Sequence, residues 1–177
     1  MVSATTALLP EPETVMAWLS EVPDPEIPVI SITELGIVRK VRHQGETLVV
    51  TVTPTYSGCP AVSMINLDIE AKLLEKGIAD FRIEQQLSPP WTTDFLSAEA
   101  RERLREYGIA PPIDGTAADG RLMARANRLA GGSNLVIACP RCGSGKTERV
   151  SQFGSTPCKA SYRCRDCLEP FDYFKCI

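Results

Sequence analysis

Residues 139–167 read CPRCGSGKTERVSQFGSTPCKASYRCRDC, and the two Cys-x-x-Cys pairs at the ends of this stretch determine how the carboxyl-terminal part folds. The first pair is Cys139 and Cys142, the second is Cys164 and Cys167, and twenty-one residues separate them. Pairs of this spacing, each on a tight turn, place four thiolates around a tetrahedral zinc ion. The sequence therefore predicts a structural zinc site; the alternatives are another thiolate-bound metal, redox dithiols or disulfides.

A metal is also what a segment of this length needs in order to fold. So short a piece buries too little apolar surface by itself, whereas zinc binding to four thiolates typically contributes ~10–16 kcal/mol of folding free energy. We expect residues 135–177 to form a zinc ribbon that opens with a strand at 135–137. Cys158 and Cys176 are left as additional candidate ligands. The aromatic residues near the end form either the ribbon's own core, which we favour, or a docking patch: Phe171, Tyr173 and Phe174.

The composition fits one medium globular domain followed by a small module: 177 residues, 44% hydrophobic and 23% charged. The net charge of −3 gives no overall basic field. From residue 139 on, seven Lys or Arg face four Asp or Glu, a formal +3. Four zinc-bound thiolates reduce this to about +1, which is too little to track a nucleic-acid backbone.

The sequence predicts a cytoplasmic protein with no membrane association. The first fourteen residues contain no Lys or Arg and only a short apolar patch, so we expect no secretory signal. No stretch reaches the length of a transmembrane helix. Six of the seven cysteines lie in the zinc-spaced tail, which suits a reducing compartment.

Hydrophobic periodicity predicts a helix, a hairpin, a helix, a strand and a helix. The expected elements are helices at 13–22, 60–76 and 97–107, and strands at 37–42, 47–53 and 81–87, with a turn at 43–46. The expected buried positions are Leu48, Val50 and Val52 on the second strand, Val62, Ile65, Ile69 and Leu73 on the central helix, and Ala100, Leu104 and Tyr107 on the last helix.

This order indicates an α+β fold, a small two-layer helix-and-sheet domain followed by the zinc-ribbon module. We assign residues 1–12 to a flexible leader, 13–109 to the α+β domain, 110–134 to a linker and 135–177 to the ribbon. The linker assignment depends on composition, because twelve of its residues are Ala, Gly or Pro.

Cys59 is the only cysteine outside the tail. We expect it at the N-cap or first position of the helix that starts near Pro60, where unpaired amides and the helix dipole favour the thiolate. Gly58 leaves room beside the thiol. The alternative is a small, inert, buried residue at the start of the helix.

Asp24 and Glu26 lie two apart on a proline-rich loop, so their carboxylates can point the same way and share a site. The alternative is a solvated loop that ends the first helix. His43 is expected in the hairpin turn and solvated, which gives little support to a cysteine–histidine dyad.

Three segments together resemble the iron–sulfur-assembly domain of SufT-type proteins: DPEIP at 24–28, ITELGIV at 32–38 and TYSGCP at 55–60. Two tail segments, FGSTPCKA at 153–160 and CLEPFDYFKC at 167–176, resemble the PaaD family of phenylacetate-degradation proteins. The resemblance covers nearly the whole chain apart from the leader and the linker.

The resemblance implies a non-catalytic accessory role: maturing or maintaining the iron–sulfur or di-iron centres of the multicomponent phenylacetyl-CoA epoxidase in phenylacetate catabolism. The implied partners are its oxygenase and reductase subunits. The resemblance makes Cys59 the functional thiol, places Asp24 and Glu26 in the same pocket, and implies a transient iron or iron–sulfur species besides structural zinc. The oligomeric state stays open, a homodimer included.

Two other functions remain as alternatives, a nucleic-acid-binding zinc ribbon and a thiol-dependent enzyme that uses Cys59 as a nucleophile. In the accessory interpretation, Cys59, Cys158 and Cys176 would form a second, labile site if the linker folds back.

Overall fold

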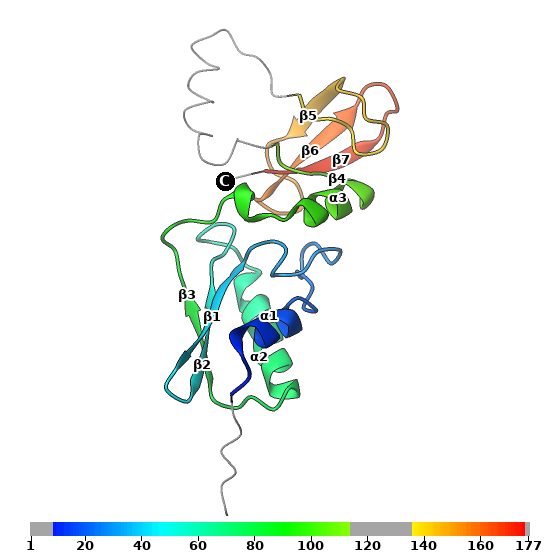
Figure 1. Cartoon of the computed structure of the whole chain (residues 1–177). Helices are drawn as coiled ribbons and strands as arrows, with labels where there is room; N and C mark the ends of the chain where they lie inside the picture. Colours follow the sequence, from blue (N-terminus) through cyan, green and yellow to red (C-terminus); the bar gives the residue numbers. More distant parts are fainter. Residues whose placement is uncertain (1–8, 114–135, 176–177) are drawn as a thin grey trace, which may run out of the picture.

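The computed structural model describes residues 9–113 and 136–175, which form two packed modules (Figure 1). The first module contains α1 (Pro12–Leu19), β1 (Val38–Gln44), β2 (Thr47–Val52), α2 (Val62–Glu75), β3 (Phe81–Gln85), a 3-10 turn at Thr93–Phe95 and α3 (Ala98–Glu106). The second, which we call the ribbon, contains β5 (Thr147–Ser151), β6 (Lys159–Cys164) and β7 (Pro170–Phe174), with β4 (Ile109–Ala110) added. The expected α+β fold class is confirmed. Much of the expected leader and linker lies outside the described residues.

The first sheet has the strand order β1-β2-β3. β1 and β2 form an antiparallel hairpin whose turn contains Gly45 at φ +66°, a conformation that glycine adopts at little cost. The turn is shorter than expected, because His43 and Gln44 pair with β2 as part of β1. β3 runs parallel to β2, and α2 provides the crossover connection that parallel neighbours need.

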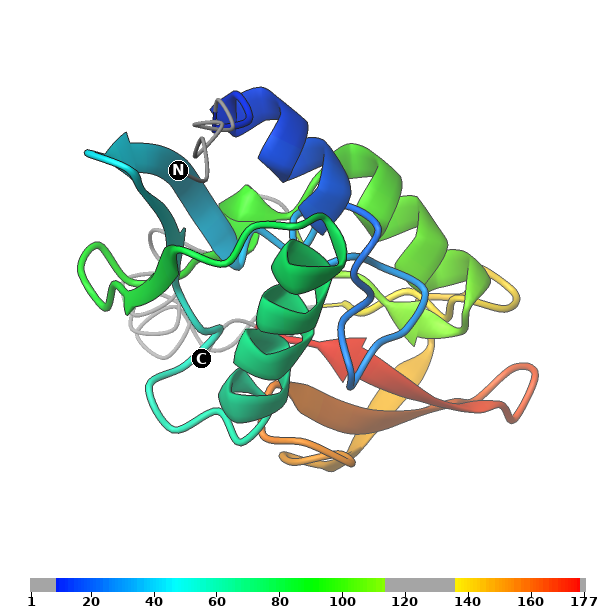
Figure 2. The same cartoon turned by 90° about the horizontal axis from the view of Figure 1, so that it is seen from below.

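α1 and α2 lie on one face of this sheet (Figure 1 and Figure 2). The predicted apolar positions of β2 and α2 are buried there, except that Val62 is only half-buried. The core beneath the helices includes Val15 and Leu19 of α1, Leu48, Val50 and Val52 of β2, and Ile65, Ile69 and Leu73 of α2.

α3 begins where Ser97 caps it, since the Ser97 hydroxyl accepts a hydrogen bond from the Ala100 N–H at 3.0 Å. Ala100 and Leu104 are fully buried, as predicted. The prediction that Tyr107 is buried is wrong, because its side chain is 55% exposed. Tyr107 is the C-cap, and the chain turns away at Gly108 (φ +91°), so Tyr107 lies beyond the part of the helix that meets the core.

The ribbon sheet has the order β4-β7-β6-β5. β5, β6 and β7 are antiparallel neighbours, whereas β4 pairs in parallel with β7. The strand expected at 135–137 is absent from the described residues 136 and 137, because β4 takes the edge beside β7. Ile137 is nevertheless buried, and its carbonyl accepts a hydrogen bond from the Thr147 hydroxyl at 2.6 Å.

The tail aromatics are buried, which confirms the core interpretation. Phe171 and Tyr173 pack around Tyr162, each with its ring centroid 5.8 Å from the Tyr162 ring. Phe174, 1% exposed, points the other way and belongs to the core of the first module. Its ring meets Trp91 edge-on, with centroids 5.9 Å apart and planes at 85°. One strand of the ribbon therefore contributes to both cores.

The two modules meet at the N-terminal end of α2. In both views this end of the helix is directed toward the ribbon (Figure 1 and Figure 2). Cys158, just before β6, belongs to the first module's core, and the Lys159 ammonium donates a hydrogen bond to the Glu26 carbonyl at 3.3 Å.

Candidate metal centre and thiol pocket

The four cysteines of the two Cys-x-x-Cys pairs converge, with all four sulfurs within 4.8 Å of one another. The Sγ atoms of Cys139 and Cys167 are 3.7 Å apart, and those of Cys142 and Cys164 are 3.6 Å apart. A tetrahedral zinc ion about 2.3 Å from each sulfur requires sulfur–sulfur distances of roughly 3.8 Å. The cluster therefore fits one zinc ion.

Backbone hydrogen bonds hold the first pair on its tight turn. The Cys139 N–H donates to the Ser144 carbonyl, and the Gly143 N–H donates to the Cys139 carbonyl, both at 2.9 Å. Each pair is followed by one residue in the left-handed region, Gly143 at φ +73° and Leu168 at φ +65°. These reversals point the sulfurs of both pairs inward.

The electrostatics of the cluster call for a cation. The backbone amides of Cys167 and Asp166 lower the pKa of Cys164 to about 7. The Glu169 amide acts in the same direction on Cys167, but burial and the neighbouring thiols outweigh it and raise the pKa of Cys167 to about 12. One thiol thus loses its proton readily while another resists, and a bound dication removes this conflict.

Asp24 is the buried carboxylate of the loop at 24–28, and its residue is only 4% exposed. Its Oδ1 accepts hydrogen bonds from the N–H groups of Glu26 at 2.9 Å and Ile27 at 2.8 Å. Burial raises the pKa of Asp24 above its usual value, against the effect of these two amides. The alternative of a solvated loop is therefore wrong for Asp24, although Glu26 is exposed.

Cys59 lies on the turn between β2 and α2 and is half-buried. The expectation that it occupies the N-cap or first helical position is wrong, because α2 begins at Val62 with Ala61 as its N-cap. The Cys59 N–H donates to the Tyr56 carbonyl at 3.1 Å, which closes a separate turn before the helix.

Cys59 lines a cavity of about 20 Å³ at the junction of the modules. Asp24 and Glu26 line it too, together with Cys158 from the ribbon. The remaining wall is mostly apolar and includes Ile27, Leu35, Ile37, Ala61, Val62, Ile65 and Phe174. The structure thus brings together four of the residues singled out in the sequence. Their chemical roles stay predictions, and Cys176 lies outside the described residues.

Cys158 forms the ribbon side of this cavity and is 7% exposed. Burial raises the pKa of its thiol, and its Sγ lies 3.0 Å from the Thr156 hydroxyl. Two neighbouring residues were missed in the sequence. Lys159 is 5% exposed and places a positive charge near Asp24, and Tyr56 has its pKa raised by burial and then by Cys59. Both stand beside quoted cysteines, but their burial depends on contacts between the modules.

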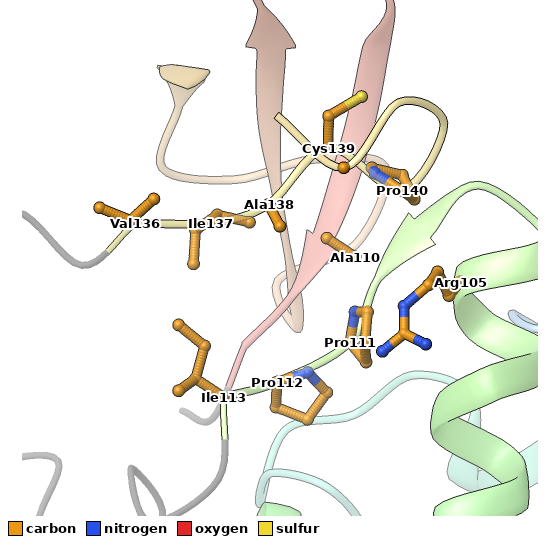
Figure 3. Close-up of a pocket in the computed structure, with 11 residues that line it drawn as sticks. Arg105, Ala110, Pro111, Pro112, Ile113, Val136, Ile137, Ala138, Cys139 and Pro140 are labelled. Atoms are coloured by element: carbon orange, nitrogen blue, oxygen red, sulfur yellow. The ribbon is translucent and has the colours of Figure 1, made fainter. Parts of the chain in front are cut away.

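A larger cavity of about 350 Å³ lies between α3, β4 and the start of the ribbon (Figure 3). Its lining includes Arg105, Pro112, Ile113 and Ile137. Cys139 also borders it, but its sulfur points away from Ile113 on the opposite wall (Figure 3). The described lining contains no carboxylate, so this cavity is separate from the metal chemistry.

Among the described residues, none of the helices is long and apolar enough to cross a membrane.

The fold and its two sulfur sites define a class of protein, an iron–sulfur cluster assembly domain joined to a zinc ribbon. The family model "Iron-sulfur cluster assembly protein" matches residues 12–80, and the model "PaaD zinc beta ribbon domain" matches residues 124–175. The chain belongs to the PaaD family, whose relatives include a component of phenylacetyl-CoA epoxidase.

The Escherichia coli (strain K12) relative, named as a component of 1,2-phenylacetyl-CoA epoxidase, is 48% identical over 168 residues, which are 95% of this chain and 94% of that protein. A Porphyromonas gingivalis protein named as an Fe-S protein maturation auxiliary factor is 36% identical over 90 residues, 50% of this chain and 85% of its own. The solved structure of a DUF59 domain from Bacillus anthracis is 28% identical, with a TM-score of 0.48, and covers 52% of this chain and 89% of that one.

Proposed function

We propose that this protein is an accessory factor that matures or maintains the metal centres of a multicomponent phenylacetyl-CoA epoxidase in the cytoplasm, without carrying out the epoxidation. The observation that carries the proposal is a half-buried thiol, Cys59, which lines a small cavity together with the buried Asp24. This thiol belongs to a module of the iron–sulfur assembly family, in a chain related to an epoxidase component and to an Fe–S maturation factor.

In this proposal Cys59 holds iron or an iron–sulfur species briefly and passes it to the oxygenase or reductase of the epoxidase. A half-buried position suits transfer, since the thiol is shielded from bulk water yet remains accessible to a partner. The zinc ion of the ribbon is structural, because four thiolates complete its coordination and leave no open position.

Two observations count against the other functions considered. The chain's single histidine, His43, is exposed on β1, and its Nε2 bonds to the Pro10 carbonyl, so it offers Cys59 no base. The ribbon's cations are largely engaged with acids, which leaves little positive surface for a nucleic acid. These ion pairs are Arg141–Glu169, Lys146–Asp166 and Arg165–Glu148.

The test is to produce the epoxidase components in a strain that lacks this chain and to restore either the wild type or Cys59→Ser. Ser57→Ala, an exposed change on the same turn, is the matched control. We expect the iron content of the purified oxygenase or reductase to fall with Cys59→Ser to the level of the strain without the chain, and to stay normal with Ser57→Ala. Full iron loading with Cys59→Ser would overturn the proposal.

A further inference from the structure

Cys158 is a ribbon cysteine that the zinc site does not use. The four zinc ligands account for the two Cys-x-x-Cys pairs, and Cys158 is absent from that cluster. It instead joins the buried core of the first module and lines the same cavity as Cys59. A thiol from each module therefore borders one small space.

The ribbon holds Cys158 in a defined position. Its carbonyl accepts a hydrogen bond from the Lys175 N–H at 2.9 Å, just beyond β7. On its other side, the Lys159 N–H donates to the Thr156 carbonyl at 3.0 Å, and the Thr156 hydroxyl lies 3.0 Å from the Cys158 sulfur. The thiol is thus fixed by backbone hydrogen bonds rather than carried on a loose loop.

We propose that Cys59 and Cys158 together bind one divalent iron ion in this cavity, so that the ribbon supplies half of the sulfur ligands. The inference rests on the proposed function and specifies its cargo as a single ion, shared between the two modules. Each thiol releases its proton to solvent as its sulfur binds the ion.

The size of the cavity favours one ion over a preformed cluster. Its volume of about 20 Å³ accommodates one water-sized particle, because a single water needs roughly 10–15 Å³. An ion bound by thiolates lies about 2.3 Å from each sulfur and fits such a space. A cluster core of several iron and sulfide atoms requires the modules to move apart.

The charges around the cavity also favour a dication with thiolate ligands. Two thiolates and the carboxylates of Asp24 and Glu26 sum to a formal −4, and Lys159 reduces this to −3. A dication brings the total to −1. Sulfur ligands select iron or zinc over magnesium or calcium.

The two thiols differ in accessibility, which suits a transferable ion. Cys158 and Asp24 form the enclosed side, at 7% and 4% exposure, whereas Cys59 is half-buried and Glu26 is exposed. An ion can therefore enter and leave past Cys59 while Cys158 retains it from within.

The test is an anaerobic titration of the zinc-loaded full-length protein with Co²⁺, which reports thiolate ligands through a near-ultraviolet charge-transfer band. We expect the wild type to bind one Co²⁺ per chain in addition to its zinc. Cys59→Ser and Cys158→Ser should each weaken this binding by at least about 100-fold, since even changes outside the ligand set cost 10–100-fold. Val150→Ser, an exposed change on β5, should bind as the wild type does.

Zinc content and circular dichroism of each variant establish that it is folded. If folded Cys158→Ser binds Co²⁺ with wild-type affinity and band intensity while Cys59→Ser does not, the shared site is refuted and the role of Cys59 stands. If the wild type takes up no second ion, the shared site is also refuted, and the client iron measurement separately decides the proposed function.

Discussion

Replacing Phe174 by alanine tests whether the two modules fold as one unit. Phe174 belongs to β7 of the ribbon sheet, yet its side chain is 1% exposed and packs in the core of the first module. Its ring meets the Trp91 ring edge-on at 5.9 Å. Trp91 is itself fixed, because its Nε1–H donates to the Leu35 carbonyl at 2.8 Å, so it cannot easily move into the space that the ring leaves.

The expected cost of Phe174→Ala follows from this burial. Truncating a buried Phe to Ala typically lowers the free energy of unfolding by ~3–5 kcal/mol, which includes the cavity left behind. Loss of the edge-to-face contact with Trp91 accounts for ~0.5–1.5 kcal/mol within that range. Total stabilities are commonly ~5–15 kcal/mol, so the variant should remain folded but separate more easily into its modules.

The assay is urea unfolding followed by two signals, tryptophan fluorescence from the first module and release of zinc from the ribbon. The wild type should give coincident midpoints, as a single cooperative unit does. Phe174→Ala should give a lower fluorescence midpoint and a separate zinc-release midpoint. Phe153→Ala, the same change at a ribbon position that is 61% exposed, should cost less than about 1 kcal/mol. Equal losses for the two variants, or separate midpoints in the wild type, would show that the reasoning is wrong.

Three further predictions concern the metal, a buried carboxylate and a glycine. Chelating zinc from the wild type should unfold the ribbon, seen as lost amide protection in hydrogen exchange, because metal binding supplies folding free energy. Burial raises the pKa of Asp24, so the native state holds this proton more tightly and the wild type loses stability as pH rises above about 4. Asp24→Asn lacks that loss, so its urea midpoint relative to the wild type should be higher at pH 7 than at pH 3.5. Gly36→Ala should cost more than about 2 kcal/mol in urea unfolding, because its φ is +72° and a Cβ would lie 2.5 Å from the Phe95 Cβ. Gly77→Ala, at φ +80° with no atom within 4 Å, should cost only the ~1–2 kcal/mol of its backbone conformation.

The features that the sequence predicted correctly depend on short spacings along the chain. Cys139 and Cys142 stand three residues apart on one turn, so their shared ligand role is written locally. The same holds for Ile65 and Ile69, whose spacing of four places them on one face of α2 and in the core. Local backbone geometry was enough to predict these positions.

The errors arose where local geometry does not decide the outcome. Cys59 was expected to begin α2, but the turn closed on the Tyr56 carbonyl competes with the helix for that backbone. Residues 109–110 were assigned to the end of the first domain and the start of the linker, yet they pair with β7 of the ribbon. The meeting of Cys158 with Cys59 has the same origin, because it depends on packing between modules far apart in the sequence.

The two sulfur sites act through one strand but cannot share a metal. β6 runs from Lys159 to the zinc ligand Cys164, and Cys158 immediately precedes it. Six extended residues at ~3.3 Å each put Cys158 roughly 20 Å from Cys164, too far for either site to lend a ligand to the other. Zinc therefore influences the cavity only by holding β6 and its neighbours in register. On this reasoning the ribbon's zinc keeps Cys158 in place opposite Cys59, so losing zinc would dismantle the second site without competing for its ligands.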